Sequence, residues 1–202
     1  MRVLLTAFEP YDDWTENSSW LTLVELLKAR PAAVELMTRR YPVDLSSLQE
    51  RLNQDLQKKP DIALHLGQSP GAAAIKLEAI ALNVAGCVDE NGRQLPPLVD
   101  AGTLAFQSRM PLGQWAEKLR RAGIPAAVSY HAGTFLCNAT MYLSHHWCEV
   151  HQHPMKVGFV HLPLATEQVA NSGRTWPSLP VATLAQAVRL LIEDFASKES
   201  PP

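Results

Sequence analysis

A cysteine near the start of a predicted helix is the side chain best suited to chemistry in this sequence. Residues 131–138 read His-Ala-Gly-Thr-Phe-Leu-Cys-Asn, which predicts a strand, a turn at Gly133, and Cys137 in the first turn of a helix. The N–H groups and positive dipole of a helix N-terminus stabilise a thiolate and can hold an oxyanion. Cys137 is therefore a candidate nucleophile that needs a base. The alternative is a cysteine that only packs in the core, because free cysteines are among the most buried residues.

A histidine and a glutamate from other parts of the chain could complete a catalytic triad with this cysteine. His161 lies at the end of the apolar stretch 157–162, where a strand would deliver a base. Glu78 stands among apolar residues, and a buried carboxylate needs a partner because an unpaired buried charge is costly. A nucleophile, an imidazole and an orienting carboxylate form the set used in nucleophilic catalysis. The alternatives are a core histidine with satisfied hydrogen bonds and a charge at a sheet edge.

Two further motifs suggest metal or phosphate binding, and both signals are weak. In residues 145–153, a helix would place His145, Cys148 and His151 or Gln152 on one face, a set that zinc accepts. The spacing matches no standard zinc pattern, and the helix dipole alone favours histidines near a C-terminus. The loop at residues 67–71 has two glycines but lacks both the dinucleotide fingerprint and the Gly-Lys-Ser/Thr ending. We therefore expect no bound metal and no cofactor.

Composition restricts the partners and the compartment. The chain has 202 residues, of which 47% are hydrophobic and 19% are charged, and its net charge is −2. Without a basic block, neither nucleic acid nor an anionic membrane is an expected partner. No apolar run reaches the length of a signal-peptide core or a membrane span, so we expect a cytoplasmic protein. The three cysteines show no C-x-x-C spacing, which argues against a disulfide framework.

The first half of the chain alternates predicted strands with predicted helices. Strands are predicted at residues 2–8, 34–43 and 62–66, and helices at residues 20–30 and 45–56, the second capped by Asp44. A strand–helix–strand order favours an α/β fold. We expect an open, twisted, mainly parallel sheet with helices on both faces, an α/β/α sandwich that spans residues 1–202 as one domain.

The second half predicts a further strand at 75–84, a long connection over 85–102, and a helix around Trp115 and Leu119 that ends at Gly123. A strand follows at 126–129, then a helix at 137–149, the strand 157–162, a loop at 170–180 and a last helix at 184–195. Ligands of such sheets bind beyond the carboxyl ends of the strands. The loops that begin at Phe8, Gly67 and Gly133 should therefore meet at one crevice.

Three stretches of the sequence resemble the pyroglutamyl peptidase I (pyrrolidone-carboxylate peptidase) family of cysteine peptidases. They are Gly-Thr-Phe-Leu-Cys-Asn at 133–138, Phe-Val-His-Leu-Pro at 159–163 and Glu-Ala-Ile-Ala-Leu-Asn-Val at 78–84. The order Glu, Cys, His along the chain matches the family as well. Residues 6–11, 17–20 and 66–68 are similar to the family's opening and to its Leu-Gly-Gln. The resemblance extends to about Gln168.

This resemblance implies removal of an N-terminal pyroglutamate (5-oxoproline) from peptides through a thioester. It implies Cys137 as the nucleophile, His161 as its base, and Glu78 as the residue that orients the imidazole. A blocked terminus offers no ammonium, so the lactam must bind in an apolar slot with few polar groups. The matching substrate-binding positions are Phe8, Tyr11, Phe135 and Leu136, with Asn17 and Gln68 as polar contacts. Family members are often dimers or tetramers, so a homo-oligomer is expected.

The chain departs from the family pattern at two places. It has Tyr11-Asp12-Asp13 where the family usually has Phe-Gly-Gly, and aspartate only partly replaces glycine at positive φ. The added charges would disfavour an anionic substrate. The family's arginine after the glutamate segment is missing from residues 85–91. The alternative to an active enzyme is a catalytically weak or silent relative that binds a blocked peptide terminus or a related lactam or amide.

Overall fold

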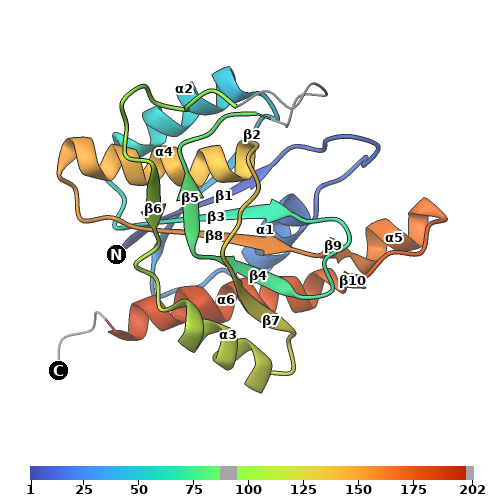
Figure 1. Ribbon diagram of the computed structural model, residues 1–202. Helices are drawn as coiled ribbons and strands as arrows, with labels where there is room; N and C mark the ends of the chain where they lie inside the picture. The colour runs from blue at the N-terminus through green and yellow to red at the C-terminus, as the bar shows by residue number, and fades with distance from the viewer. Residues whose placement is uncertain (87–94, 199–202) are drawn as a thin grey trace.

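A six-stranded mixed sheet with the order β2-β1-β3-β8-β4-β7 forms the centre of the computed structural model, which describes residues 1–86 and 95–198 (Figure 1). Its strands are β1 (Arg2–Phe8), β2 (Glu35–Tyr41), β3 (Ile62–Gln68), β4 (Ile75–Glu78), β7 (Ala126–Ser129) and β8 (Lys156–Leu162). The first three and β8 run parallel, whereas β4 is antiparallel to β8 and parallel to β7. The expected mainly parallel α/β sheet is confirmed.

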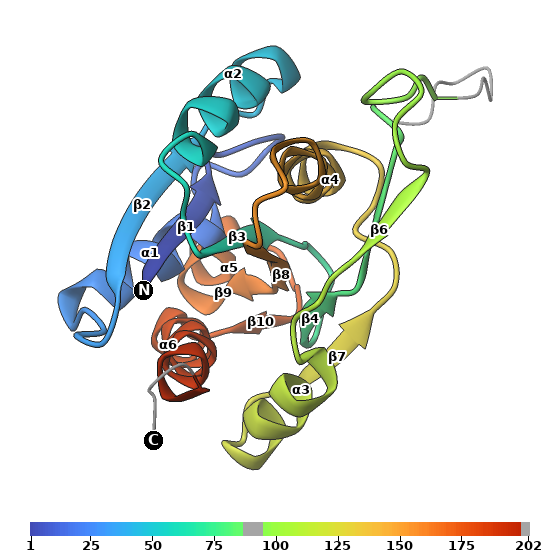
Figure 2. The same cartoon turned by 90° about the vertical axis from the view of Figure 1, so that its left-hand side faces the viewer.

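Helices cover both faces of the sheet, as a parallel sheet requires. Figure 2 shows α2 (Leu45–Leu56) and α4 (Leu136–His151) on one side, with α1 (Ser18–Lys28), α3 (Leu112–Arg121) and α6 (Val181–Lys198) on the other. Each side has its own hydrophobic cluster, and both clusters pack on the same strands. Every residue of β3 is buried, which explains its almost continuous apolar sequence. Among the described residues, no helix is both long enough and apolar enough to cross a membrane.

Local capping explains where two helices begin. Asp44 caps α2 by accepting a hydrogen bond from the backbone N–H of Ser47 at 2.8 Å, and the bounds of this helix agree with the prediction. The first helix begins two residues earlier than predicted. Asn17 is its cap, because its Oδ1 accepts a hydrogen bond from the backbone N–H of Ser19 at 3.0 Å.

The predicted strand at 75–84 is wrong as one continuous strand, since the chain leaves the main sheet at Ala79. Residues 75–78 form β4, whereas β5 (Ile80–Leu82) pairs with β6 (Ala105–Gln107) in a separate antiparallel sheet that lies beside α4. The backbone of Ala79 bonds to Ser129 on one side and to Ser108 on the other. Glu78 is thereby the last residue of β4. Residues 87–94 of the predicted connection lie outside the described residues.

The predicted loop at 170–180 is also wrong in part. Its beginning belongs to α5 (Thr166–Ser172), and its end contains β10 (Ser178–Leu179), which pairs with β9 (Leu164–Ala165). The side chain of Gln168 accepts a hydrogen bond from the backbone N–H of Ala165 and so supports the start of α5. Gly173, at φ 65°, ends it. The Gly-, Pro- and Ser-rich composition concealed these short elements.

The expected convergence of three strand ends holds for β1 and β3 but not for β7. Because β7 is parallel to β4, it runs opposite to β1, β3 and β8, so its carboxyl end does not lie at their edge. Residues 130–135 instead carry the chain to the start of α4. There the sulfur of Cys137 lies only 3.2 Å from the place a Cβ would occupy on Gly67.

Candidate active site

Glu78 and His161 form a direct hydrogen bond across two antiparallel strands. Nδ1 of His161 lies 2.8 Å from Oε1 of Glu78. In the register of β4 and β8, Lys76 pairs with His161 and Glu78 pairs with Phe159, so the two side chains are diagonal neighbours on one face. Glu78 is fully buried, and within the described residues its Oε2 has no hydrogen-bond partner. The carboxylate therefore depends on the imidazole as its partner.

Cys137 is the second residue of α4 and contacts the same imidazole. Its charge and its hydrogen-bonding interaction with the imidazole both raise the pKa of His161. Nδ1 of His161 faces Glu78, which leaves Nε2 for the sulfur. Phe135, the N-cap residue of α4, makes no side-chain capping hydrogen bond. The first-turn N–H groups of α4 therefore remain suited to a negative charge.

Opposing effects set the pKa of His161. Burial lowers the pKa, but the charge and hydrogen bond of Cys137, together with the hydrogen bond and charge of Glu78, raise it, and the net result is a pKa of about 9. The imidazole is therefore protonated at neutral pH. A neighbouring imidazolium stabilises a thiolate, so the geometry favours a reactive sulfur.

A small apolar cavity of about 190 Å³ opens beside Cys137. All six predicted substrate-binding residues line it together with this cysteine, although they come from β1, the loop after it, β3 and the start of α4. The lining residues are Phe8, Tyr11, Asn17, Val43, Gln68, Phe135, Leu136 and Cys137. Sequence reasoning missed Val43. Its position two residues after the end of β2, at the edge where the site lies, was the available signal.

The polar residues of this cavity differ in what they can offer a ligand. The amide of Asn17 is engaged within the protein, since Oδ1 accepts from Ser19 and Nδ2 donates to the carbonyl of Glu9. The hydroxyl of Tyr11 donates to the backbone oxygen of Gln68 at 3.3 Å. Burial, together with the charge of Cys137, raises the pKa of Tyr11 to about 12, so it stays a neutral donor. Asn17 thus shapes the cavity, whereas Gln68 and Tyr11 can contact a ligand.

Gly67 and Phe159 are two site residues that the sequence alone did not reveal. A Cβ on Gly67 would lie 2.7 Å from the Phe159 ring and 3.2 Å from the sulfur of Cys137. The Phe159 ring packs against the His161 imidazole with 4.8 Å between centroids and against Phe8 with 6.4 Å. Gly67 is therefore required for close packing around the thiol.

The structure accommodates the two aspartates that replace the family's glycines. Asp12 adopts φ 56°, in the left-handed region that aspartate tolerates better than most residues. Asp13 pairs with Arg174 at 3.0 Å, and neither aspartate lines the cavity. Trp14 packs edge-on against Trp176 with 6.3 Å between centroids. The loop that carries Tyr11 is thus fastened to the segment after α5.

The histidine-rich end of α4 does not gather metal ligands. Across residues 1–86 and 95–198, no group of three or more His, Cys, Asp or Glu side chains could hold a metal ion. His151 Nδ1 lies 2.9 Å from the carbonyl oxygen of Trp147, and His153 Nε2 lies 3.0 Å from that of Pro60. Burial raises the pKa of Cys148 to about 11, which disfavours the thiolate that binds zinc.

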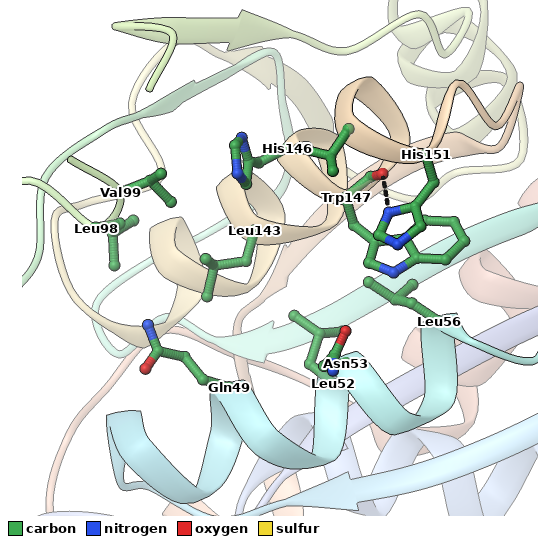
Figure 3. Close-up of a pocket in the computed structure, with 11 residues that line it drawn as sticks. Gln49, Leu52, Asn53, Leu56, Leu98, Val99, Leu143, His146, Trp147 and His151 are labelled. Atoms are coloured by element: carbon green, nitrogen blue, oxygen red, sulfur yellow. Dashed lines mark hydrogen bonds between the residues drawn. The ribbon is translucent and has the colours of Figure 1, made fainter. Parts of the chain in front are cut away.

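A separate groove of about 310 Å³ lies between α2 and α4 (Figure 3). In this view Trp147 and His151 stack on each other, and Leu52 and Leu56 of α2 point toward them. Neither Cys137, His161 nor Glu78 lines this groove. It holds no pairing of a nucleophile with a base, so the chemistry belongs to the smaller cavity.

A thiol, an imidazole and a buried carboxylate at the rim of an α/β sheet define the class of the cysteine hydrolases. A sequence model of the family described as "Pyroglutamyl peptidase" matches residues 1–198. The chain belongs to the pyroglutamyl peptidase family.

Curated relatives and solved structures agree with this assignment. The chain is 34% identical to the pyrrolidone-carboxylate peptidase of Pyrococcus furiosus, with 96% of this chain and 97% of that protein covered. It is 35% identical to the enzyme of that name from Clavibacter michiganensis, with 94% and 90% covered. The crystal structure of pyrrolidone carboxyl peptidase from Fervidobacterium islandicum AW-1 superposes with a TM-score of 0.89 at 36% identity, covering 98% of this chain and 99% of that one. The pyrrolidone carboxyl peptidase from Thermococcus litoralis gives 0.85 at 29% identity, with 98% and 96% covered.

Proposed function

We propose that this protein removes an N-terminal pyroglutamate from peptides by a thioester mechanism that uses Cys137, His161 and Glu78. One observation carries the proposal. His161 is hydrogen-bonded to Glu78 and interacts with Cys137, and the cysteine forms part of the wall of a small apolar cavity. Family membership supports the substrate class, because the relatives are named pyrrolidone-carboxylate peptidases.

The proposed first half-reaction forms a thioester. The Cys137 thiolate attacks the carbonyl carbon that joins the pyroglutamyl ring to the next residue, and the carbonyl oxygen becomes an oxyanion. First-turn N–H groups of α4 stabilise that oxyanion. His161 then donates its proton to the departing amine as the C–N bond breaks. Glu78 keeps the imidazole in place and stabilises its positive charge throughout.

In the second half-reaction, His161 accepts a proton from water, and the resulting hydroxide attacks the thioester carbonyl. The C–S bond breaks, free pyroglutamate leaves, and the Cys137 thiolate is restored beside a protonated His161. Both halves use the same imidazole as acid and then as base. The net reaction consumes one water and releases pyroglutamate and a shortened peptide.

Recognition of the lactam ring follows from the composition of the cavity. The rings of Phe8 and Phe135 and the side chain of Leu136 offer apolar walls, which suit an uncharged ring. The Nε2 group of Gln68 is buried and donates to no partner among the described residues, so it can donate to the lactam oxygen. A free amino terminus would bring an ammonium into this apolar space, at a high desolvation cost.

Hydrolysis of a pyroglutamyl fluorogenic amide tests the proposal. The native protein should cleave it, Cys137→Ala should not, and Cys148→Ala should cleave at the native rate because Cys148 lies outside the cavity. Alkylation of the native protein should abolish cleavage. Cleavage that survives complete alkylation of Cys137 would refute the mechanism, and pyroglutamyl binding without turnover would identify a silent relative.

Three further expectations belong to the same proposal. A cytoplasmic location suits a protein whose described cysteines, Cys137 and Cys148, are free and whose nucleophile must stay reduced. Residues 1–202 act as one catalytic domain, which is supported by two hydrophobic clusters that share one sheet. We also propose a dimer or a tetramer, by similarity to the family. Light scattering coupled to size-exclusion chromatography measures the number of copies directly.

A further inference from the structure

Two donors hold the oxygen of the Gln68 amide, and its nitrogen has no partner. Gln68 ends β3, is 5% exposed and lines the Cys137 cavity. Its Oε1 accepts from the backbone N–H of Ser18 at 2.7 Å and from Nε2 of Gln168 at 2.9 Å. Within the described part of the chain, its Nε2 makes no hydrogen bond although the atom is buried. An unmade buried hydrogen bond is costly, so this donor calls for a ligand acceptor.

Backbone groups fix the orientation of the second amide, that of Gln168. This residue lies on α5 and is 6% exposed. Its Oε1 accepts from the backbone N–H of Ala165 at 2.8 Å, and its Nε2 donates to the carbonyl of Glu16 at 2.9 Å. A flipped amide would place a donor against the Ala165 N–H and an acceptor against the Glu16 carbonyl. Gln168 therefore presents a donor to Gln68 and cannot present an acceptor.

The two glutamines thus form a hydrogen-bond relay, in which the fixed amide of Gln168 determines which way the amide of Gln68 faces. Both Ser18 and Gln168 require the oxygen of Gln68 on their side, which turns its Nε2 away from them. We propose that Gln168 is a positioning residue for substrate recognition, holding the Gln68 amide so that Nε2 donates to the substrate's lactam oxygen. This inference rests on the proposed function, which supplies the lactam. Gln168 itself acts only through Gln68.

Replacing Gln168 has a different effect depending on the new side chain. In Gln168→Ala, one donor is lost and Ser18 alone holds the Gln68 oxygen. In Gln168→Glu, a carboxylate oxygen faces the Gln68 oxygen and the Glu16 carbonyl, which favours a flipped Gln68 amide. The flipped amide turns an acceptor toward the lactam oxygen. The glutamate variant should therefore impair recognition more than the alanine variant does.

Steady-state kinetics on a pyroglutamyl fluorogenic amide test this relay. Gln168→Ala should raise KM about tenfold, the scale of one hydrogen bond, with kcat changed far less. Gln68→Ala should raise KM at least as much. Adding Gln168→Ala to Gln68→Ala should have no further effect, because the relay acts through one amide. If the two increases in KM multiply in the double variant, the proposal is overturned and Gln168 has a general structural role.

Arg174→Met is the matched control. Arg174 pairs with Asp13 and fastens the same loop that Gln168 contacts at Glu16, but it does not touch Gln68. Its KM should stay within about twofold of the native value, since an exposed ion pair contributes little. An increase equal to that of Gln168→Ala would show that loosening the loop explains the effect. Thermal unfolding of each variant confirms that the protein is folded.

A binding measurement separates this proposal from the peptidase assignment. 2-Pyrrolidone should protect Cys137 from alkylation by iodoacetamide in the native protein. In Gln168→Ala, the same protection should require an about tenfold higher concentration of 2-pyrrolidone. The unprotected alkylation rate should be equal in both. If the native protein cleaves the amide and the Gln168 variants keep the native KM, the relay is overturned and the peptidase function stands. If the native protein does not cleave the amide but 2-pyrrolidone protects Cys137 as expected, the peptidase function is overturned and the relay stands. Absent protection in the native protein overturns the relay.

Discussion

Oε1 of Glu78 lies 2.8 Å from Nδ1 of His161, although the two residues are 83 positions apart in the sequence. The antiparallel pairing of β4 with β8 creates this contact, whereas β2, β1, β3 and β8 run parallel to one another. One reversed strand thus joins a buried carboxylate to the imidazole that contacts Cys137.

Glu78→Gln should lower kcat/KM by on the order of 10⁴-fold, the size of the loss when the orienting carboxylate of a triad is replaced by its amide. The amide keeps the shape but cannot stabilise an imidazolium, so the pKa of His161 should fall, as measured by NMR. Glu117→Gln, on the exposed face of α3, is the control and should retain native activity. Native activity in Glu78→Gln would contradict the assigned role.

The activity should decline on the alkaline side as His161 loses its proton. Its pKa of about 9 means that the imidazolium, which protonates the leaving amine, disappears as the pH rises through that value. We expect the alkaline limb of the kcat/KM profile near pH 9. In Glu78→Gln this limb should move to lower pH, because the carboxylate contributes to the raised pKa. If the alkaline limb of Glu78→Gln stays at the native pH, a group other than His161 controls the loss of activity.

Gly67→Ala should disable the site. The added Cβ would lie 2.7 Å from the Phe159 ring and 3.2 Å from the Cys137 sulfur, so at least one of them must move. Displacing a nucleophile by about 1 Å can cost on the order of 10²-fold in rate. Kinetics and thermal unfolding measure the effect.

Gly113→Ala is the matched control for this substitution. Gly113 lies in α3, and nothing lies within 4 Å of its added Cβ. Because alanine favours helix, this variant should be more stable by up to about 1 kcal/mol with native activity. Equal losses in both variants would mean that the close approach at Gly67 is unimportant.

Acid should destabilise the fold through His65. This residue of β3 is fully buried, and Thr6 and Ser144 bond to its two ring nitrogens at 2.8 and 3.0 Å. Burial, with the nearby charge of His145, lowers its pKa from 6.5 to about 3. Between these values the unfolded chain binds the proton and the folded chain does not, so stability falls as the pH drops below about 6.5.

The size of this effect is measurable by urea unfolding. From pH 8 to pH 5, His65 should contribute a loss of about 2 kcal/mol in the free energy of unfolding. His65→Asn should be less stable at neutral pH but should show a smaller loss over the same pH range. An unchanged pH dependence in that variant would exclude His65 as the source.

The sequence by itself determined the chemistry and the local elements. Cys137 at a helix start, His161 at the end of an apolar run and Glu78 among apolar residues were recognisable because each signal lies within a few neighbouring positions. The Asp44 cap and the strands β1, β3 and β8 were recognisable for the same reason. Hydrophobic runs and capping residues act over one turn of helix or one strand, so they can be identified without coordinates.

Only the tertiary structure decided the direction of β4 and β7, the division of 75–84 at Ala79, and the orientation of the Gln68 amide. These features depend on partners far away in the sequence: Phe159 for Glu78, Ser108 for Ala79 and Gln168 for Gln68. No local pattern encodes which strand pairs with which, or which donor reaches a given oxygen. Such contacts arise only when packing brings distant segments within hydrogen-bond distance, which is why the sequence supplied the reacting groups and the fold supplied their geometry.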